Sequence, residues 1–383
     1  MNLEEIRKEI DGIDDAMSEL FEKRMAMVLN VAKYKKENNL PIVNLEREKS
    51  ILERVTKGQS RELATTTRAF FANIIALATT YEEMIIGQDS EAVELIKKAL
   101  ENTPKQFPKS ATVACQGIEG ANSQIAANSL FTEPDIKYVN SFEAVFQSVE
   151  NGLCAYGILP IENNLHGSVI EVYDLMKKYE FYIAKSIKVK IKHALLAKQG
   201  VSLDEITEVF SHSQALNQCS DFLKSLKNVK ITPFANTAMA AESAANSERE
   251  DIAAIADINC ANLYNLTVVK SDIQNSDNNY TRFICISKNL QIYPEANKIS
   301  LMLTIPHRPG SLGGIISKFS GLGVNLTKLE SRPIPGKDFE FMFFIDFDAD
   351  VKDDEVLGLL ADLEHAADKL TFLGNYLEST TNA

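Results

Sequence analysis

The sequence lacks the features of a membrane protein and of a metalloprotein. No apolar run approaches the ~20 residues that a membrane-spanning helix needs, and the polar start MNLEEIRKEI does not have the pattern of a signal peptide. The five cysteines are scattered without CxxC spacing, and the five histidines are dispersed along the chain. We therefore expect reduced thiols, no metal ion, no other cofactor and a cytoplasmic location.

The chain also lacks an excess of positive charge. It has 40 Lys and Arg against 53 Asp and Glu, which gives a formal net charge of -13 at pH 7. A general nucleic-acid binder needs the opposite balance, so neither nucleic acid nor membrane is an expected partner, and an anionic ligand must be held by local cations. The sequence contains no P-loop and no GxSxG elbow, so the chemistry of those motifs is not supported.

The length of 383 residues is too great for one ordinary core, and three sequence patterns divide the chain. Residues 1–87 read as all helix, and residues 88–110 as a polar, partly helical linker. In residues 111–288 short apolar runs alternate with helical stretches, which predicts an α/β domain with a largely buried sheet. Residues 298–378 show the order βαββαβ, which predicts an α+β ferredoxin-like domain.

The first predicted helix, residues 3–37, carries an apolar heptad stripe that contains a cation. Arg24 stands on this stripe where a leucine would be expected, and Lys35 lies beside its end. A bundle interior rejects charge unless a partner pairs with it, and no carboxylate of this segment shares the stripe. One interpretation is a site for a small anion, and the alternative is a coiled coil whose long cations reach water. The stripe consists of Leu3, Ile6, Ile10, Ile13, Met17, Leu20, Arg24, Met27, Val31 and Tyr34.

The length of this helix predicts a homo-oligomer. At about 1.5 Å per residue it would be roughly 50 Å long, which is more than a small helical module can cover by itself. We therefore expect an intertwined homodimer at least. Two further helices are predicted, one from near Asn44 and one from about Glu62.

The segment from Ile6 to Val55, with the ATTYE segment that ends at Glu82, resembles the helical chorismate mutases. The resemblance implies an isomerase site that binds a dianion and converts chorismate to prephenate by a Claisen rearrangement. Such a site folds the substrate and stabilises the charge on the breaking ether oxygen. The resemblance gives that catalytic role to Lys35 and to Glu82, which stands where relatives carry Gln and must be protonated to donate. It gives substrate binding to the partner's Arg7 and to Arg24, Asn44, Arg47 and Glu48.

In the α/β region, polar clusters follow the ends of apolar runs, where open α/β sheets bind their ligands. Two clusters, residues 160–164 (PIENN) and residues 211–218, end predicted strands, and a third, residues 279–283 (NYTRF), introduces the last strand. Each cluster alone also reads as an ordinary capped turn. In this order and spacing they resemble prephenate dehydratase across residues 111–288.

This second resemblance implies two lobes like those of a periplasmic binding protein, with the site in the cleft between them. The implied reaction is that of a carbon–oxygen lyase, in which prephenate loses carbon dioxide and its ring hydroxyl to give phenylpyruvate. Thr281 is implied as the proton donor to the leaving hydroxyl, and Arg282 is expected either to hold a substrate carboxylate or to brace the lobes. Ala121 and Asn122 depart from the family pattern, which leaves the contacts near Gly120 open. The implied substrate-binding residues are Glu162, Asn163, Ser211, His212, Gln214, Gln218, Arg282 and Phe283.

Two turns of the C-terminal region, beside Gly310 and at the end of the predicted strand at Glu330, read alone as ordinary connections. They resemble the phenylalanine-binding motifs of the ACT regulatory domain. The resemblance implies feedback inhibition by L-phenylalanine at a dimer interface, transmitted by a shift in domain arrangement. Gly313 stands where the family usually has an apolar residue. The implied effector-binding residues are Gly310, Ser311, Leu312, Asn325, Glu330, Ser331, Arg332 and Pro333.

Taken together, the resemblances cover nearly the whole chain and predict a bifunctional chorismate mutase/prephenate dehydratase with an ACT domain, an enzyme of phenylalanine biosynthesis. Its expected small-molecule partners are chorismate, prephenate and L-phenylalanine. One alternative is a dehydratase whose helices serve only for dimerisation. The other is an amino-acid-responsive binding protein without catalysis, which would have no use for Thr281.

Overall fold

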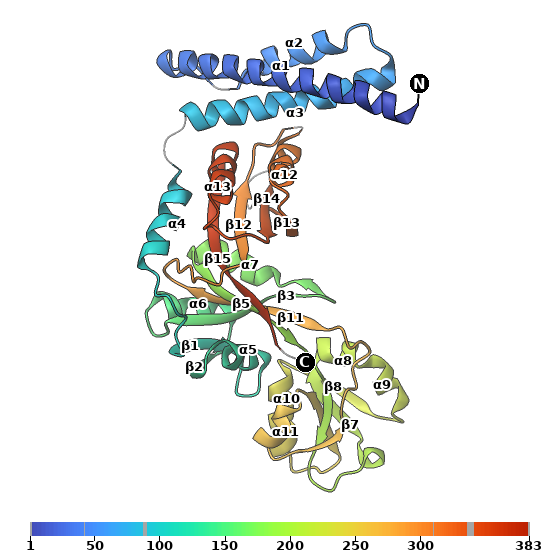
Figure 1. Ribbon diagram of the computed structural model, residues 1–383. Coiled ribbons are helices and arrows are strands. Elements are labelled where there is room, and N and C mark those ends of the chain that lie inside the picture. Colours follow the sequence, from blue (N-terminus) through green and yellow to red (C-terminus); the bar gives the residue numbers. More distant parts are fainter. Residues whose placement is uncertain (1, 42, 87–89, 309, 335–340, 382–383) are drawn as a thin grey trace. The chain divides into compact units, whose positions relative to one another are not determined.

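The computed structural model describes residues 2–41, 43–86, 90–308, 310–334 and 341–381 (Figure 1). The chain divides into two compact units. The first comprises Met1–Lys98 and Ser300–Phe372, and the second comprises Ala99–Ile299 and Leu373–Ala383. The predicted boundary at residues 87 and 88 lies outside the described residues. None of the helices in the described ranges is long and apolar enough to cross a membrane.

The helical module of the first unit consists of α1 (Leu3–Glu37), α2 (Leu45–Thr56) and α3 (Arg61–Ile86). A capping box starts α1: Asn2 and Glu5 each donate a backbone N–H to the other's side chain, at 2.8 and 2.9 Å. On α1, Val28 and Ala32 are buried, and the neighbouring helix α3 buries Ile75 and Ala78. The predicted helices are confirmed within one or two residues at each end.

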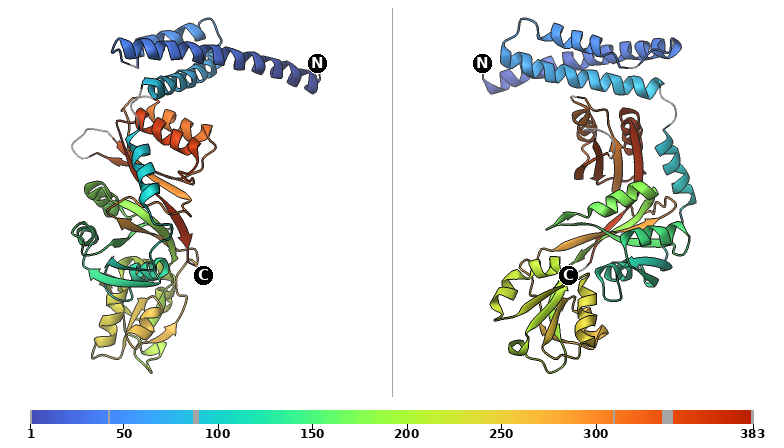
Figure 2. Two further views of the ribbon diagram at one scale, coloured as in Figure 1. Left: turned by 60° about the vertical axis from the view of Figure 1, so that its left-hand side comes forward. Right: turned by 180° about the vertical axis from the view of Figure 1, so that it is seen from behind.

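The heptad stripe of α1 is not the face that α1 buries within the chain. Its apolar side chains are exposed, from Leu3 at 61% and Ile13 at 59% to Met27 at 60% and Tyr34 at 61%. In the left-hand view of Figure 2 the N-terminal half of α1 runs beyond α3 without a neighbour. An exposed apolar surface of this length is typical of a protein–protein interface.

The rest of the first unit has the predicted ferredoxin-like order. The sheet has the strand order β13-β14-β12-β15, which is the arrangement of a split βαβ fold. Phe319 and Phe347 meet edge to face at 5.0 Å in its core. The elements are β12 (Lys298–Thr304), α12 (Ser311–Gly321), β13 (Leu326–Pro333), β14 (Phe341–Phe347), α13 (Asp354–Ala366) and β15 (Lys369–Thr380), preceded by α4 (Glu91–Asn102).

The second unit has two lobes, as predicted. In the first lobe the strand order is β15-β5-β11-β3-β1-β2, with β1 parallel to both neighbours and β11 antiparallel to β3 and β5. The elements are β1 (Ser110–Gln116), α5 (Asn122–Leu130), β2 (Glu133–Val139), α6 (Phe142–Glu150), β3 (Tyr156–Asn163), β4 (Gly167–Ser168), α7 (Ile170–Tyr179), β5 (Tyr182–Lys190) and β11 (Tyr280–Ser287).

The second lobe contains a five-stranded sheet of order β10-β6-β9-β7-β8. The chain enters this lobe after β5 and returns before β11, so residues 191–193 and 271–279 connect the lobes. The elements are β6 (Ala194–Ala197), η1 (Leu203–Glu205), β7 (Glu208–His212), α8 (Ser213–Gln218), α9 (Ser220–Ser225), β8 (Lys230–Phe234), α10 (Thr237–Asn246), β9 (Ile252–Ala256), α11 (Asn259–Leu263) and β10 (Thr267–Lys270). All five cysteines are buried and free.

Candidate active sites

A small cavity of about 80 Å³ lies where the two lobes of the second unit meet. A neighbouring cavity of about 200 Å³ shares Gln218 with it and is also lined by His166 and Asn279. Among the described lining residues of both cavities there is no Lys, Arg, Asp or Glu. The first cavity is lined by Asn122, Asn163, Ile191, His193, His212, Gln214, Ala215, Gln218, Thr237 and Thr281. The lobes therefore bring together the predicted residues Asn163, His212, Gln214, Gln218 and Thr281.

The side chain of Asn163 fixes the hydrogen bonding of Thr281. Its Oδ1 accepts the backbone N–H groups of Leu165 and His166 at 3.0 and 3.1 Å, which determines which end of the amide is oxygen. Its Nδ2 donates to Thr281 Oγ1 at 3.0 Å and to Asn279 Oδ1 at 2.8 Å. Because Thr281 Oγ1 accepts from Asn163, its own proton is available for a donor role elsewhere.

A chain of polar contacts crosses from one lobe to the other. His193 Nε2 lies 2.7 Å from Gln218 Oε1, which can only accept, so Nε2 carries the proton. Gln218 Nε2 in turn lies 3.3 Å from Nδ1 of His166 on the opposite lobe. Burial lowers the pKa of His193, while the contact with Gln218 opposes the change. A neutral His193 thus fixes the orientation of the Gln218 amide at the cleft.

His212 is also held as a neutral ring. It precedes α8, where its Nδ1 accepts the backbone N–H of Gln214 at 3.3 Å. Burial lowers the pKa of His212. An accepting nitrogen requires the unprotonated ring, so both observations agree.

Four predicted site residues do not line the cleft. Ser211 is fully buried and donates to the carbonyl of Ile255 at 2.6 Å, inside the second sheet. Phe283 is buried in the apolar core of the first lobe. Glu162 and Arg282 pair with each other at 3.1 Å. Neighbouring residues of a strand point to opposite faces, so Arg282 lies on the face away from Thr281.

Asn122, Thr237 and His193 line the cleft although they were not among the candidates. Asn122 begins α5 and Thr237 begins α10. Asn122 stood at a departure from the family pattern, so the resemblance did not select it, and the position of each residue at the start of a helix was the usable signal. His193 has no such signal, because it is an isolated histidine beside a short apolar strand.

In the helical module the chain brings together Arg24, Lys35 and Glu82. Lys35 Nζ lies 2.5 Å from Glu82 Oε2, and both side chains are mostly buried. Arg24 donates to the carbonyl of Ile74 at 3.4 Å. Burial lowers the pKa of Arg24, and the nearby Glu82 carboxylate opposes the change.

The remaining predicted mutase residues lie apart from this group. Arg47 is exposed on the first turn of α2, while Glu48 is half-buried. Asn44 caps α2, since its Oδ1 accepts the N–H of Arg47 at 3.0 Å. Arg7 is exposed and stands 17 positions before Arg24 on the same helix, a separation of roughly 25 Å. One chain therefore supplies part of the predicted site, without Arg7.

The predicted effector residues are grouped around α12 and β13. Gly310 has φ +90 and precedes α12, whose first residue is Ser311. The Ser311 hydroxyl is buried and has no hydrogen-bond partner within the described part of the chain. Asn325 Nδ2 donates to Asp348 Oδ2 at 3.3 Å, and Glu330 pairs with Lys328 at 3.2 Å. Ser331, Arg332 and Pro333 complete strand β13.

The chain therefore combines a helical module, in which Lys35 pairs with Glu82, and a two-lobed domain with an amide-lined cleft. Residues 6–83 match the family model of chorismate mutase type II, and residues 113–291 match that of prephenate dehydratase. The chain is 30% identical over 379 residues to the bifunctional chorismate mutase/prephenate dehydratase of Aquifex aeolicus, with 98% of this chain and 97% of that protein covered. For the enzyme of the same name from Buchnera aphidicola the identity is 33% over 355 residues, with 90% and 88% covered.

A solved structure of prephenate dehydratase from Arthrobacter aurescens, in complex with L-Phe, is also similar. It has a TM-score of 0.63 and 28% sequence identity, with 70% of this chain and 89% of that chain covered. The chain belongs to the family of bifunctional chorismate mutase/prephenate dehydratases. It converts chorismate to prephenate and prephenate to phenylpyruvate, two steps of phenylalanine biosynthesis.

Proposed function

We propose that Thr281 donates the proton that the ring hydroxyl of prephenate needs in order to leave. The hydrogen bond from Asn163 Nδ2 to Thr281 Oγ1 carries this proposal, because it turns the threonine proton away from Asn163. A free hydroxyl is a weak acid, so it acts here as a strong hydrogen-bond donor or as a relay in a cleft that excludes water.

The lack of fixed charge in the cleft suits decarboxylation. Prephenate is a dianion, and the transition state disperses the charge of its ring carboxylate as carbon dioxide leaves. A cation placed at that carboxylate would stabilise the ground state more than the transition state. The described cleft residues are amides, hydroxyls and histidines instead, and the starts of α5 and α10 contribute partial positive charge.

The assay that tests this proposal is product analysis of Thr281→Ala with chorismate as the only substrate. Chorismate should be consumed at the normal rate, prephenate should accumulate and phenylpyruvate should be lost. A variant that still forms phenylpyruvate at the parent rate would refute the role of Thr281.

For the mutase reaction, we propose that Lys35 and Glu82 act on the ether oxygen while Arg24, Arg47 and the partner's Arg7 hold the two carboxylates. Asn44 and Glu48 are proposed to bind the rest of the substrate, with Glu48 at the hydroxyl. The short contact between Lys35 and Glu82 supports the first part, because both groups already converge on one point beside α1 and α3.

A homodimer is proposed because it would bury the exposed apolar side chains of the heptad stripe of α1. Burying one Leu, Ile or Met side chain contributes roughly 1.5–3 kcal/mol, and this stripe exposes a row of them. A second copy that packs antiparallel along α1 would bury the stripe and bring its own Arg7 to the site.

The ferredoxin-like part is proposed to be an ACT regulatory domain that binds L-phenylalanine. Its topology and the predicted motif residues around α12 and β13 support this assignment, as does the buried hydroxyl of Ser311, which has no hydrogen-bond partner among the described residues. The similar Arthrobacter aurescens enzyme was solved with L-Phe bound. Inhibition of the pathway by its end product would follow from such binding.

A further inference from the structure

On the sheet face opposite the cleft, a buried set of polar contacts lies behind Thr281. The set consists of Arg282 and its partners Glu162, Ser186, Tyr376 and Glu378, and we name it the Arg282 network. Arg282 donates to Tyr376 Oη at 2.6 Å and from Nε to Ser186 Oγ at 3.2 Å. Its Nε also lies 2.6 Å from Glu378 Oε2, and its Nη1 lies 3.1 Å from Glu162 Oε1. The Arg282 guanidinium therefore binds acceptors of the protein itself rather than a substrate carboxylate.

Two members of the Arg282 network come from the last strand of the chain, far from β11 in sequence. Strand β15 pairs in parallel with β5, with Glu378 opposite Ser186 and Thr380 opposite Lys188. Gly374 permits this approach, because a Cβ there would overlap the backbone oxygen of Ile183. The pairing places Glu378 next to the strand that neighbours β11.

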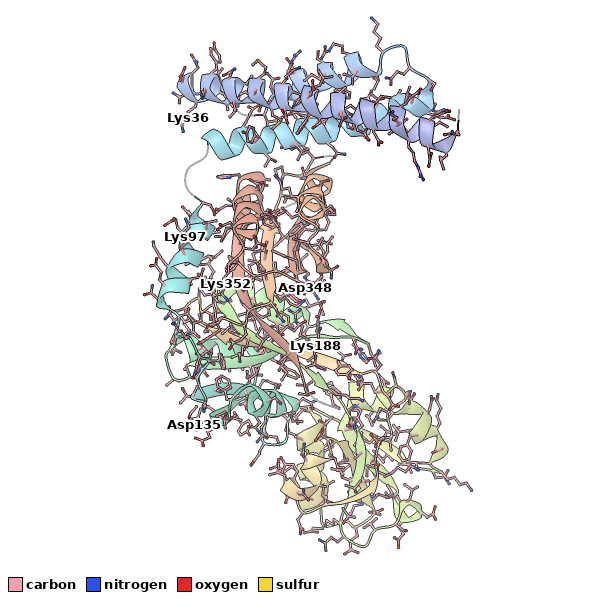
Figure 3. All side chains as sticks on the ribbon, in the orientation of Figure 1. Lys36, Lys97, Asp135, Lys188, Asp348 and Lys352 are labelled. Carbon is pink, nitrogen blue, oxygen red and sulfur yellow. The ribbon has the colours of Figure 1, made fainter. Side chains whose placement is uncertain are left out.

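Cations surround the Glu378 carboxylate. Two lysines contact this carboxylate in addition to Arg282. The Nζ atoms of Lys188 and Lys298 lie 2.8 and 3.4 Å from Glu378 Oε1, and Lys188 is labelled in Figure 3. Burial alone would raise the pKa of Glu378, but the three cations together lower it. The carboxylate therefore remains ionised and bound to Arg282.

The backbone of β11 is irregular on one side at this point. The β11–β3 pairing runs from Thr281 opposite Asn163 to Arg282 opposite Glu162, and then shifts register before Phe283. A register shift interrupts the ladder of backbone hydrogen bonds on that side and lets the strand bend. The ladder with β5 continues here, with Thr281 opposite Val189. The side-chain contacts of Arg282 therefore supplement the β5 ladder in holding the strand beside Thr281.

We propose that Glu378 and Tyr376 are positioning residues for prephenate dehydration, which hold Arg282 and thereby place the Thr281 hydroxyl at the cleft. The inference rests on the proposed role of Thr281. It gives the C-terminal strand β15 a positioning role, although the chemistry of neither reaction requires a residue of this strand.

The test uses Glu378→Gln and Tyr376→Phe in the full chain, with prephenate as substrate for the dehydratase and chorismate for the mutase. Both variants should lower the dehydratase kcat about tenfold with little change in KM, because misplacement affects the reacting group more than binding. Glu378→Asp, which keeps the charge with a shorter reach, should lie between Glu378→Gln and the parent. Mutase activity should remain at the parent level, and a thermal melting curve of each variant should report whether the second unit, which contains Glu378 and Tyr376, is folded.

Glu208→Gln is the matched control. Glu208 is another buried carboxylate of the second unit, and it binds Lys230 and Arg249 at 2.7 and 2.6 Å on the lobe that lacks Thr281. It should lower the melting temperature as Glu378→Gln does but leave the dehydratase kcat near the parent value. The proposal is overturned if Glu378→Gln and Tyr376→Phe keep the parent kcat, or if kcat falls equally in Glu208→Gln.

Tyr376→Phe removes one hydroxyl and keeps the ring, so it carries the test if Glu378→Gln does not fold. A parallel assay of Thr281→Ala separates this proposal from the one on which it rests. An active Thr281→Ala with a slow Glu378→Gln would mean that the network supports a group other than Thr281, which would also overturn the inference as stated.

Discussion

Asn163 Nδ2 and Thr281 Oγ1 lie 3.0 Å apart, on neighbouring strands whose register places the two residues directly opposite each other. The direction of this hydrogen bond is fixed, since two backbone N–H groups occupy the amide oxygen of Asn163. The threonine thus accepts from the sheet and is free to donate into the cleft.

Reversing the direction of this hydrogen bond should slow dehydration. Asn163→Asp keeps the shape of the side chain but offers only acceptors, so it would draw the Thr281 proton away from the substrate. We expect the dehydratase kcat to fall roughly 10²-fold, the lower end of what a positioned proton donor contributes, with mutase activity unchanged. Asn164→Asp is the control for the loss of an amide donor, because Asn164 is exposed, its Nδ2 donates to Asn278 O and its oxygen accepts from Tyr280 N. An active Asn163→Asp would contradict this account of the cleft.

Glu82→Gln should keep mutase activity near the parent level, because the glutamine amide can donate to the ether oxygen from the same position. Glu82→Ala removes the side chain beside Lys35 and should slow the mutase reaction roughly 10²-fold. The dehydratase rate, measured on the same preparations with prephenate, serves as the internal control. Parent-level mutase activity in Glu82→Ala would exclude the role of this side chain.

Mixing two inactive variants should restore mutase activity if the partner's Arg7 completes the site. Arg7→Ala and Lys35→Ala each damage every site of their own homodimer, but a mixed dimer has one intact site. A refolded equal mixture should recover about one quarter of the parent sites. Arg24→Ala mixed with Lys35→Ala is the control and should recover none, because those residues come from the same chain. Recovery in neither mixture would place Arg7 outside the site.

L-phenylalanine at millimolar concentration should inhibit the dehydratase, and Gly310→Ala should weaken that inhibition. Gly310 has φ +90, where an alanine is strained by roughly 1–2 kcal/mol, and it begins the predicted effector motif. Gly200→Ala is the matched control, since Gly200 has φ +85, equally open surroundings and a position in the second lobe. Equal inhibition curves for the parent and Gly310→Ala would argue against an effector site at this turn.

Much of the fold follows from local patterns in the sequence. The helices α1, α2 and α3 and the βαββαβ order have strong periodicity and clear ends, so the sequence predicts them within a few residues. The cleft residues Asn163, Gln218 and Thr281 were predicted because their motifs, at the ends or starts of strands, resemble those of prephenate dehydratase. The Arg282 network could not be predicted, since Glu378 lies 96 positions after Arg282 and only the pairing of β15 with β5 brings them together. Strand alternation alone, however, would have placed Arg282 and Thr281 on opposite faces.

The pairing of β15 with β5 also decides where the catalytic part of this chain can be cut. A fragment that stops after β11 would leave the backbone N–H and C=O groups of β5 without their neighbour along Lys185–Lys188. Unpaired edges of this kind recruit strands from other molecules. An isolated dehydratase fragment of this protein should therefore tend to aggregate unless residues 373–380 are supplied, for example by fusing them through a short linker.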